Sequence, residues 1–340
     1  MSALVSVVIT SYNKAPYLEQ SVKSVLSQTY AEIECIIVDD GSTDNTREIA
    51  EQLTRQDSRV QYFLKPNGGV SSARNFSFSH VNGEWVQFLD ADDWIHEDKI
   101  RSQLDCLNGY PRDRVAFYSD YERVYVDKTD KIVKRQVHHI GALTREQLIA
   151  RLLICPDFLA SSSFPLLQQT MLFSRALLDE RFFDESLPAC EDRELVLNWL
   201  YRDVPFIHTP IVGAFYRKHA RNLTDQGTVM RQSYIRYFEL VKQRYEDLLP
   251  LCQTSIHFLL EKTLEEKDWE TFKRALPLVT AFPVPLLNKK VRASSPFWLQ
   301  VIYKIRQLLP NFVFYERYRG PRSKKLLAAL SRLPSFTSNK

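Results

Sequence analysis

The sequence predicts an α/β fold in which a largely parallel central sheet is flanked by helices and followed by a C-terminal helical extension. Short apolar segments rich in Val and Ile alternate with helical segments through the first half of the chain. This alternation is typical of a parallel, doubly wound sheet. Three polar loops, SYN, DDGS and DADD, each follow a predicted strand. Because ligands bind at the carboxyl ends of such strands, these loops define a candidate site.

The elements of the first half follow the hydrophobic pattern of the sequence. Apolar, β-branched runs predict strands at Leu4–Thr10, Ile33–Val38, Val60–Leu64 and Trp85–Leu89. Apolar residues at helical spacing predict the intervening helices, at Pro16–Gln28, from a Ser42 or Thr43 cap to about Leu53, and at Val70–Ser79.

Beyond about Val115 the pattern becomes mixed. It predicts strands at Val115–Val126 and Val212–Tyr216, and helices at Arg145–Ile154, Asp192–Tyr201, Tyr234–Leu249, Ser255–Glu265 and Trp269–Leu278. We expect a boundary near residue 225, which divides the chain into an α/β domain, 1–225, and a helical region, 226–340.

The composition is that of a globular protein in a reducing compartment. Of the 340 residues, 44% are hydrophobic and 25% are charged, which suffices for a real core. The five cysteines lie far apart without a CxxC pair, which argues against a zinc site or a disulfide framework. The first residues lack a signal-peptide pattern, and no apolar stretch is long enough to span a membrane. We therefore expect a cytoplasmic protein.

The net charge of +4 conceals an uneven distribution of charge along the chain. From Leu286 to the end, 12 Lys and Arg residues face one acid, Glu316. Aromatic and aliphatic residues are interleaved with these bases, and such basic amphipathic segments lie on anionic membrane surfaces. The alternative is a helix packed on the α/β domain. We expect no nucleic-acid partner, because no recognition module accompanies the charge.

The DADD motif places Asp90, Asp92 and Asp93 directly after an apolar strand. An acidic run on a surface is usually only solvated, but two carboxylates about 5 Å apart repel by roughly 3 kcal/mol at an effective dielectric near 20. A positive charge must offset that repulsion. Clustered oxygens suit Mg²⁺ or Mn²⁺, which keeps waters and shares a diphosphate, so we expect a divalent cation here.

The other motifs each have an ordinary structural explanation. DDG at 39–41 is also a common turn, and KPNGGVSSARN is a glycine loop before a helix, where anions are favoured, but neither a Walker A loop nor GxGxxG. Glu191 and Asp192 begin a predicted helix, where acids complement the helix dipole. His219, in YRKH, is a lone histidine of the kind that is more often structural.

Together the motifs are specific. VSVVITSYN, VDDGSTDNT, NGGVSSARN, GEWVQFLDADDW, RFFDESLPACEDREL and FYRKH, in this order over roughly residues 4–224, resemble the inverting family 2 glycosyltransferases of the GT-A fold, which is Rossmann-like. Two departures lie on the acceptor side. Arg193 follows the ED pair, and the usual Gly before FDE is missing.

The resemblance implies roles for the residues that match the family motifs. Thr10 and Tyr12 would line the nucleotide pocket, Tyr12 against the base. Asp40, with Asp39 nearby, would accept a hydrogen bond from a pyrimidine N3–H. Arg74 and Glu191 would take part in nucleotide-sugar binding, and Asp90 would point towards the ribose. Asp92, as part of the DxD motif, would bind the metal, and His219 would bind the metal or the diphosphate. Asp192 would be the catalytic base.

The implied activity is a metal-dependent, inverting, hexosyltransferase-type transfer in polysaccharide or glycolipid synthesis. The donor would be a UDP- or dTDP-sugar, the acceptor a saccharide or a lipid-linked hydroxyl, and the cofactor Mg²⁺ or Mn²⁺. The protein would sit on the cytoplasmic face of the membrane. One alternative, a nucleotidyltransferase, does not explain the ED pair and YRKH. The other is a scaffold of the same fold without turnover, which intact DADD and Asp192 argue against.

Overall fold

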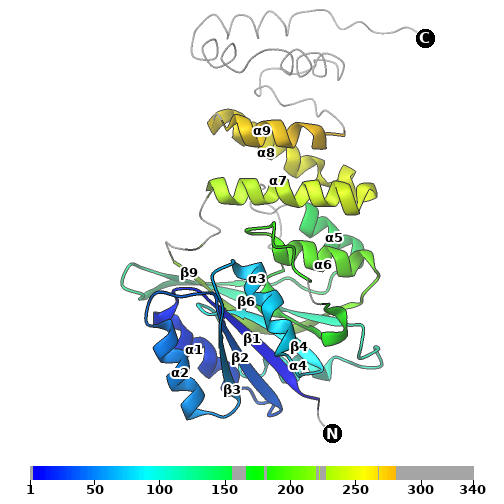
Figure 1. Cartoon of the computed structure of the whole chain (residues 1–340). Coiled ribbons are helices and arrows are strands. Elements are labelled where there is room, and N and C mark those ends of the chain that lie inside the picture. Colours follow the sequence, from blue (N-terminus) through cyan, green and yellow to red (C-terminus); the bar gives the residue numbers. More distant parts are fainter. Residues whose placement is uncertain are drawn as a thin grey trace, which may run out of the picture. The chain divides into compact units, whose positions relative to one another are not determined.

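The structure, a computed structural model, describes residues 3–154, 166–179, 182–219, 222, 227–266 and 268–280 (Figure 1). The chain divides into two compact units, Met1–Tyr237 and Phe238–Lys340. Within the described residues of the first unit, nine strands form one sheet in the order β3-β2-β1-β4-β8-β6-β9-β5, with β7 paired to β6. The predicted α/β fold class is confirmed.

The first half of the sheet is parallel. It contains β1 (Val5–Ser11), β2 (Ile33–Asp39), β3 (Val60–Leu64) and β4 (Trp85–Asp90), and β1 pairs in parallel with both β2 and β4. Every residue of β1 and β2 is buried. A strand covered on both faces has no polar face, which explains why these segments form continuous apolar runs in the sequence.

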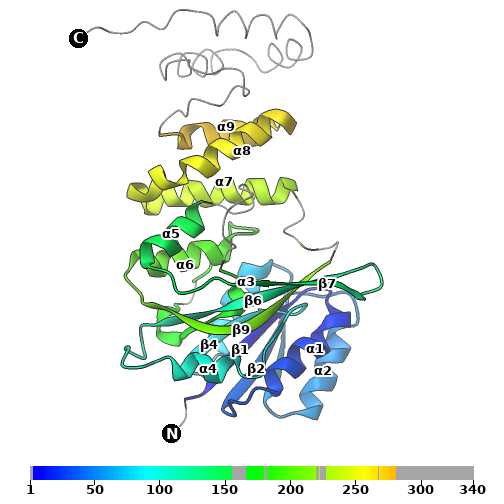
Figure 2. The ribbon, with the colours of Figure 1, turned by 180° about the vertical axis from the view of Figure 1, so that it is seen from behind.

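Three helices connect these strands: α1 (Ala15–Leu26), α2 (Thr46–Gln56) and α3 (Val70–Phe76). α1 and α2 lie side by side in both views (Figures 1 and 2). In α1 the buried residues Leu18, Val22 and Val25 recur at helical spacing, as expected for a helix with one apolar face.

The predicted cap of α2 is wrong. The helix begins at Thr46, and Asp44 Oδ1 accepts hydrogen bonds from the Thr46 amide at 3.0 Å and from its hydroxyl at 2.5 Å. Ser42 instead accepts a hydrogen bond from the Asn13 amide, and the Thr43 amide donates to the Asn13 side chain. Ser42 and Thr43, the two predicted caps, therefore form hydrogen bonds with Asn13 of the SYN loop.

The second half of the sheet is mixed. Its elements are β5 (Trp94–Ile95), α4 (Lys99–Asp105), β6 (Ala116–Val126), β7 (Ile132–His138), α5 (Arg145–Leu153), β8 (Met171–Ser174), α6 (Glu191–Tyr201) and β9 (Phe206–Lys218). β8 is antiparallel to β4 and β6, and β9 is parallel to β6. Figure 2 shows the β6–β7 hairpin extending from the sheet.

β9 is longer than the predicted strand Val212–Tyr216, and it contains a bulge. Its register against β6 jumps from Ser119 opposite Thr209 to Asp120 opposite Val212. Pro210 lies in the bulge, where its missing N–H costs no ladder hydrogen bond. The bulge lets β9 continue to Lys218, so that His219 follows the strand directly.

The C-terminal helices are α7 (Gly227–Arg244), α8 (Gln253–Glu266) and α9 (Trp269–Ala275), with a 3₁₀ segment at Glu246–Cys252. α7 begins and ends earlier than the predicted Tyr234–Leu249. In the second unit, Arg274 forms a bidentate ion pair with Glu239 at 2.8 and 2.9 Å. No helix in the described part of the chain is long and apolar enough to cross a membrane. The basic tail from Leu286 lies outside the described residues.

Candidate functional site

The carboxyl ends of β1, β2 and β4 meet at one edge of the sheet. In the register, Thr10 lies opposite Asp90, and Ser11 opposite Asp39. The Thr10 hydroxyl is 3.4 Å from Asp90 Oδ1. Tyr12, one residue beyond β1, is 48% exposed and therefore available to a ligand. The structure thus brings the SYN, DDGS and DADD loops together as the sequence predicted.

Arg74 joins this edge to the start of α6. Its Nη2 is 2.9 Å from Asp90 Oδ1, and its Nη1 is 2.7 Å from Glu191 Oε1. The guanidinium carbon lies 5.1 Å from the ring centre of Phe183. Burial disfavours the charge on Arg74, but Asp90, Glu191 and Asp192 keep its pKa above the ordinary value. Arg74 is thus a permanently charged link between the DxD motif and the ED pair.

Glu191 and Asp192 occupy the first turn of α6. Burial raises the pKa of Glu191 to about 7, opposed by the charge of Arg74. Burial also raises the pKa of Asp192, while Arg193 and Arg74 oppose the shift. The Asp192 carboxylate accepts a hydrogen bond from the Arg193 amide at 2.8 Å. A carboxylate with a raised pKa is a better proton acceptor, which is what general-base chemistry requires.

Asp92 is held by two side chains of the protein, Lys14 and His219. Its Oδ2 contacts the Lys14 ammonium and lies 3.0 Å from His219 Nε2. Burial would raise the pKa of Asp92, but the contacts with His219 and Lys14 lower it overall. Asp92 therefore carries its charge in this structure.

Asp93 has the opposite character. Its Oδ2 accepts a hydrogen bond from Gln169 Nε2 at 2.5 Å, and its Oδ1 accepts one from the Arg217 amide at 2.8 Å. Burial, with the charges of Asp92 and Asp90, raises the pKa of Asp93 well above its usual range. Of the three acids, Asp93 is thus the one for which both carboxylate oxygens accept hydrogen bonds from the surrounding protein.

Aromatic stacking positions the end of β9. The guanidinium carbon of Arg217 lies 4.7 Å from the ring centre of Tyr17 and 4.9 Å from that of Trp94, and Arg217 Nε donates to the Asp92 carbonyl at 2.9 Å. Tyr17 also stacks on His219, with ring centres 5.5 Å apart. These contacts hold the His219 imidazole against Asp92.

Asp39 and Asp40 are engaged by the chain itself. Asp39 accepts hydrogen bonds from the Ser42 amide at 2.8 Å and from the Tyr62 hydroxyl at 2.9 Å. A carboxylate offers about four lone-pair sites, so each of the two carboxylates can accept further hydrogen bonds.

The glycine loop KPNGG binds the Asp40 carboxylate. Asp40 accepts hydrogen bonds from the Gly68 amide at 2.9 Å, the Gly69 amide at 2.7 Å and the Lys65 ammonium at 2.6 Å. Gly41 has φ +78°, and a Cβ there would lie 2.9 Å from the Asn67 amide nitrogen. The DDG turn and the glycine loop therefore lock together, and the anion expected at this loop is a side chain of the protein.

The described residues contain no group of three or more His, Cys, Asp or Glu side chains arranged to hold a metal ion. Asp92 and His219 are nevertheless in contact, and the side chain of Asp90, two residues before Asp92, is 39% exposed. One or two carboxylates with an imidazole fit Mg²⁺ or Mn²⁺, which completes its shell with waters and substrate phosphates. The donor set fits such an ion if the Lys14 ammonium leaves Asp92.

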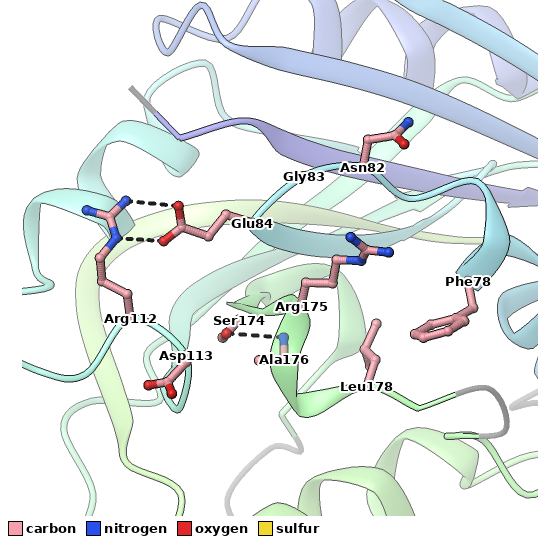
Figure 3. A pocket seen from close by; sticks show the side chains of 10 residues that line it. All are labelled: Phe78, Asn82, Gly83, Glu84, Arg112, Asp113, Ser174, Arg175, Ala176 and Leu178. Atoms are coloured by element: carbon pink, nitrogen blue, oxygen red, sulfur yellow. Dashed lines mark hydrogen bonds and ion pairs between the residues drawn. The ribbon is translucent and has the colours of Figure 1, made fainter. Parts of the chain in front are cut away.

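A separate pocket of about 550 Å³ lies at the amino end of β4 (Figure 3). It is lined by Phe78, Asn82, Gly83, Glu84, Arg112, Asp113, Ser174, Arg175, Ala176 and Leu178. None of the predicted site residues is among these, so the pocket is distinct from the candidate site.

Sequence reasoning missed several residues of the site. Lys14, Tyr17 and Arg217 contact Asp92 or its neighbours, and Gln169 contacts Asp93. Lys14 directly follows SYN, and Arg217 lies in YRKH, so position beside a motif was an available signal. Gln169 has no such signal.

Comparison with known proteins identifies the family of this chain. Residues 6–163 match the family model described as Glycosyl transferase family 2. An uncharacterized glycosyltransferase of Rickettsia prowazekii is 30% identical over 337 residues, which cover 95% of this chain and 98% of that protein. The protein belongs to glycosyltransferase family 2.

Solved structures show the same fold at low identity. S. aureus TarS 1–349 in complex with UDP-GlcNAc has a TM-score of 0.58 at 18% identity, covering 83% of this chain and 82% of that chain. A mannosyltransferase from Pyrobaculum calidifontis, in complex with GDP-Man and Mn²⁺, has a TM-score of 0.53 at 16% identity, covering 97% and 85%. The fold is therefore GT-A.

Proposed function

We propose that the protein is a metal-dependent, inverting hexosyltransferase that moves a sugar from a UDP- or dTDP-sugar to an acceptor hydroxyl. The observation that carries this proposal is the bridge made by Arg74 between Asp90 and Glu191. It joins the donor-side DxD motif and the ED pair into one site. Two solved neighbours that share the fold hold UDP-GlcNAc or GDP-Man, which supports a nucleotide-diphosphate sugar as donor.

The donor would bind at the carboxyl ends of the strands. The exposed Tyr12 ring offers a surface for the base, beside Thr10 and the Asp39-Asp40 turn. Arg74 is oriented by Asp90 and Glu191, so that the nucleotide meets a positive charge whose position is already set.

Asp92 and His219 would hold a divalent cation, and Asp90 would lie beside it. Mn²⁺ in the Pyrobaculum neighbour supports this assignment. When bound, the ion supplies electrostatic stabilisation of the charge that develops on the departing nucleoside diphosphate.

Asp192 would act as the base. Its carboxylate takes the proton of the acceptor hydroxyl while the hydroxyl oxygen bonds to the anomeric carbon of the sugar. The bond between that carbon and the diphosphate oxygen breaks, and attack from the opposite face inverts the configuration. A single displacement needs one base and no covalent nucleophile.

The acceptor would be a saccharide or a lipid-linked hydroxyl, reached at the cytoplasmic face of a membrane through the basic tail from Leu286. Twelve bases against one acid in that segment support an anionic surface as its partner.

A screen of UDP-, dTDP- and GDP-sugars by thermal shift, with Mn²⁺ or with EDTA, tests the donor. Hydrolysis of the stabilising sugar nucleotide then separates an enzyme from a scaffold that only binds. Stabilisation by a UDP- or dTDP-sugar followed by turnover is the expected result. Binding without hydrolysis or transfer to any acceptor would favour the scaffold.

A further inference from the structure

We propose that Lys14 is a built-in counter-cation of Asp92, which a divalent ion must displace and which then binds the diphosphate of the donor. This inference rests on the proposed metal-dependent function. With Lys14 in this role, the ion and the nucleotide diphosphate bind as a coupled pair.

The Lys14 ammonium occupies the carboxylate oxygen of Asp92 that a metal ion would need. Lys14 Nζ and His219 Nε2 both contact Oδ2 of Asp92. The other acids of the motif are engaged as well, Asp90 by Arg74 and Asp93 by Gln169. A divalent cation that binds Asp92 would therefore be repelled by the positive charge of the Lys14 ammonium.

Lys14 is the partner of Asp92 that can move. His219 is confined by the stacked Tyr17 ring, and its amide donates to Asn222 at 2.6 Å. Its side chain is 7% exposed, whereas that of Lys14 is 25% exposed and carries four rotatable bonds. Displacement therefore costs less at Lys14 than at His219.

The backbone of Lys14 is anchored, so its ammonium moves about a defined point. The Lys14 amide donates to Thr46 Oγ1 at 3.2 Å, and the adjacent Asn13 has φ 53°. The Asn13 side chain accepts a hydrogen bond from the Thr43 amide at 2.8 Å. Lys14 consequently stays in the loop that also presents Tyr12, where a displaced ammonium remains close to the nucleotide.

Charge balance then couples the two ligands. A divalent ion alone must compete with Lys14, and a nucleotide diphosphate alone meets the charges of Asp90 and Asp92. When both bind, the ion neutralises the carboxylates and the released ammonium pairs with phosphate. Each ligand must raise the affinity of the other by the same factor, because coupling between binding equilibria is reciprocal.

The test measures binding of Mn²⁺ to the full chain, by the electron paramagnetic resonance signal of the free ion, with and without UDP. Lys14→Met should tighten Mn²⁺ binding in the absence of UDP by about tenfold, the usual lower range of a coupling effect, and should weaken UDP binding in the presence of Mn²⁺ by a similar factor. Lys14→Arg keeps the charge and should behave like the wild type. Lys23→Met, on the solvent side of α1 in an ion pair with Glu19, is the matched control.

The outcomes separate the inference from the function on which it rests. If the wild type binds Mn²⁺ with UDP, but Lys14→Met and Lys14→Gln both bind Mn²⁺ alone no more tightly than the wild type, the role of Lys14 is refuted and the metal assignment stands. If the wild type binds no Mn²⁺ even with UDP, the metal-dependent function itself is wrong. Measuring two neutral variants guards against one that does not fold.

Discussion

Arg74 and Glu191 are 117 positions apart in the sequence, yet Arg74 Nη1 lies 2.7 Å from Glu191 Oε1. Since Arg74 also contacts Asp90, one buried guanidinium neutralises acids from two motifs. Removing one partner of a buried ion pair is far more costly than removing an exposed pair, because a charge remains without compensation. Arg74 should therefore matter for stability as well as for binding.

We expect Arg74→Met to lower the free energy of unfolding by about 3–5 kcal/mol, the range for a broken buried pair. Urea denaturation at pH 8 measures it. Arg112→Met is the matched control, since the Arg112–Glu84 pair is exposed and such pairs contribute at most about 1 kcal/mol.

The loss of stability caused by Arg74→Met should depend on pH in a defined direction. Burial raises the pKa of Glu191 to about 7 even beside Arg74, and without Arg74 it rises further. The pKa of this carboxyl group is higher in the folded state than in the unfolded state, where it is about 4.3. Such a group destabilises the folded state as the pH rises from the unfolded-state pKa through the folded-state pKa. The effect of Arg74→Met should therefore shrink between pH 8 and pH 5. An equal loss at both would contradict the charge argument.

Asp192→Asn should retain nucleotide affinity while transfer falls by about 10²–10⁴, the contribution of a general base. The amide keeps the shape of the side chain but cannot accept the hydroxyl proton. Transfer rates and nucleotide dissociation constants measure the two effects. Asp203→Asn, at an exposed position just beyond α6, should change neither. A variant of Asp192 with nearly wild-type transfer would mean that another residue is the base.

The pH dependence of transfer should report the environment of Asp192. Burial raises the pKa of Asp192, and Arg193 is the largest influence that lowers it. The base must be ionised, so kcat/KM should fall at acidic pH with an apparent pKa above that of an ordinary aspartate, about 3.9. Arg193→Gln should move this acidic fall of kcat/KM to higher pH. A shift to lower pH would mean that Arg193 does not act on the base through its charge.

Asp92→Asn should remove the stabilisation of the protein by UDP or dTDP in the presence of Mn²⁺ or Mg²⁺. The variant lacks the charged carboxylate that would face the ion, whereas the wild type should lose the same stabilisation in EDTA. Melting temperatures with nucleotide alone, metal alone and both together provide the measurement. Wild-type stabilisation that survives EDTA would rule out the metal role of Asp92.

The sequence predicted the parallel half of the sheet and its polar edge because both leave strong local signals. β1, β2 and β4 are covered on both faces, so their apolar runs stand out. The site motifs follow those strands directly. By contrast, β7 is mostly exposed and polar, and β5 spans only Trp94–Ile95. Such strands form because they pair with β6 and β9, and this long-range pairing leaves no local pattern in the sequence.

The contacts that complete the site were beyond prediction for a similar reason. Lys14 reaches Asp92 across 78 positions, and Gln169 reaches Asp93 across 76. Motif order identified which acids matter but not which side chains of the protein contact them. A divalent ion was expected to offset the repulsion within DADD, and in this structure Lys14, His219 and Arg74 contact two of its acids.

The basic tail from Leu286 lies outside the described residues. From Pro296 onward apolar and aromatic residues such as Phe297, Tyr303 and Ile305 alternate with Lys304 and Arg306. We expect the full chain to co-sediment with anionic vesicles in a salt-sensitive manner, since charge attraction is screened within about 8 Å at physiological ionic strength. A chain truncated before Pro296 should no longer sediment but should still bind nucleotide.

Vesicle composition decides between the two explanations of the tail. A surface that attracts basic residues does so by about 1 kcal/mol for each residue near it, so neutral vesicles should bind far less protein than anionic ones. Binding to neutral and anionic vesicles alike would show that charge is not the driving force. A truncated chain that fails to fold, as judged by its melting transition, would instead show that the tail packs on the protein. Retained nucleotide binding with lost sedimentation would leave the membrane as the partner of this segment.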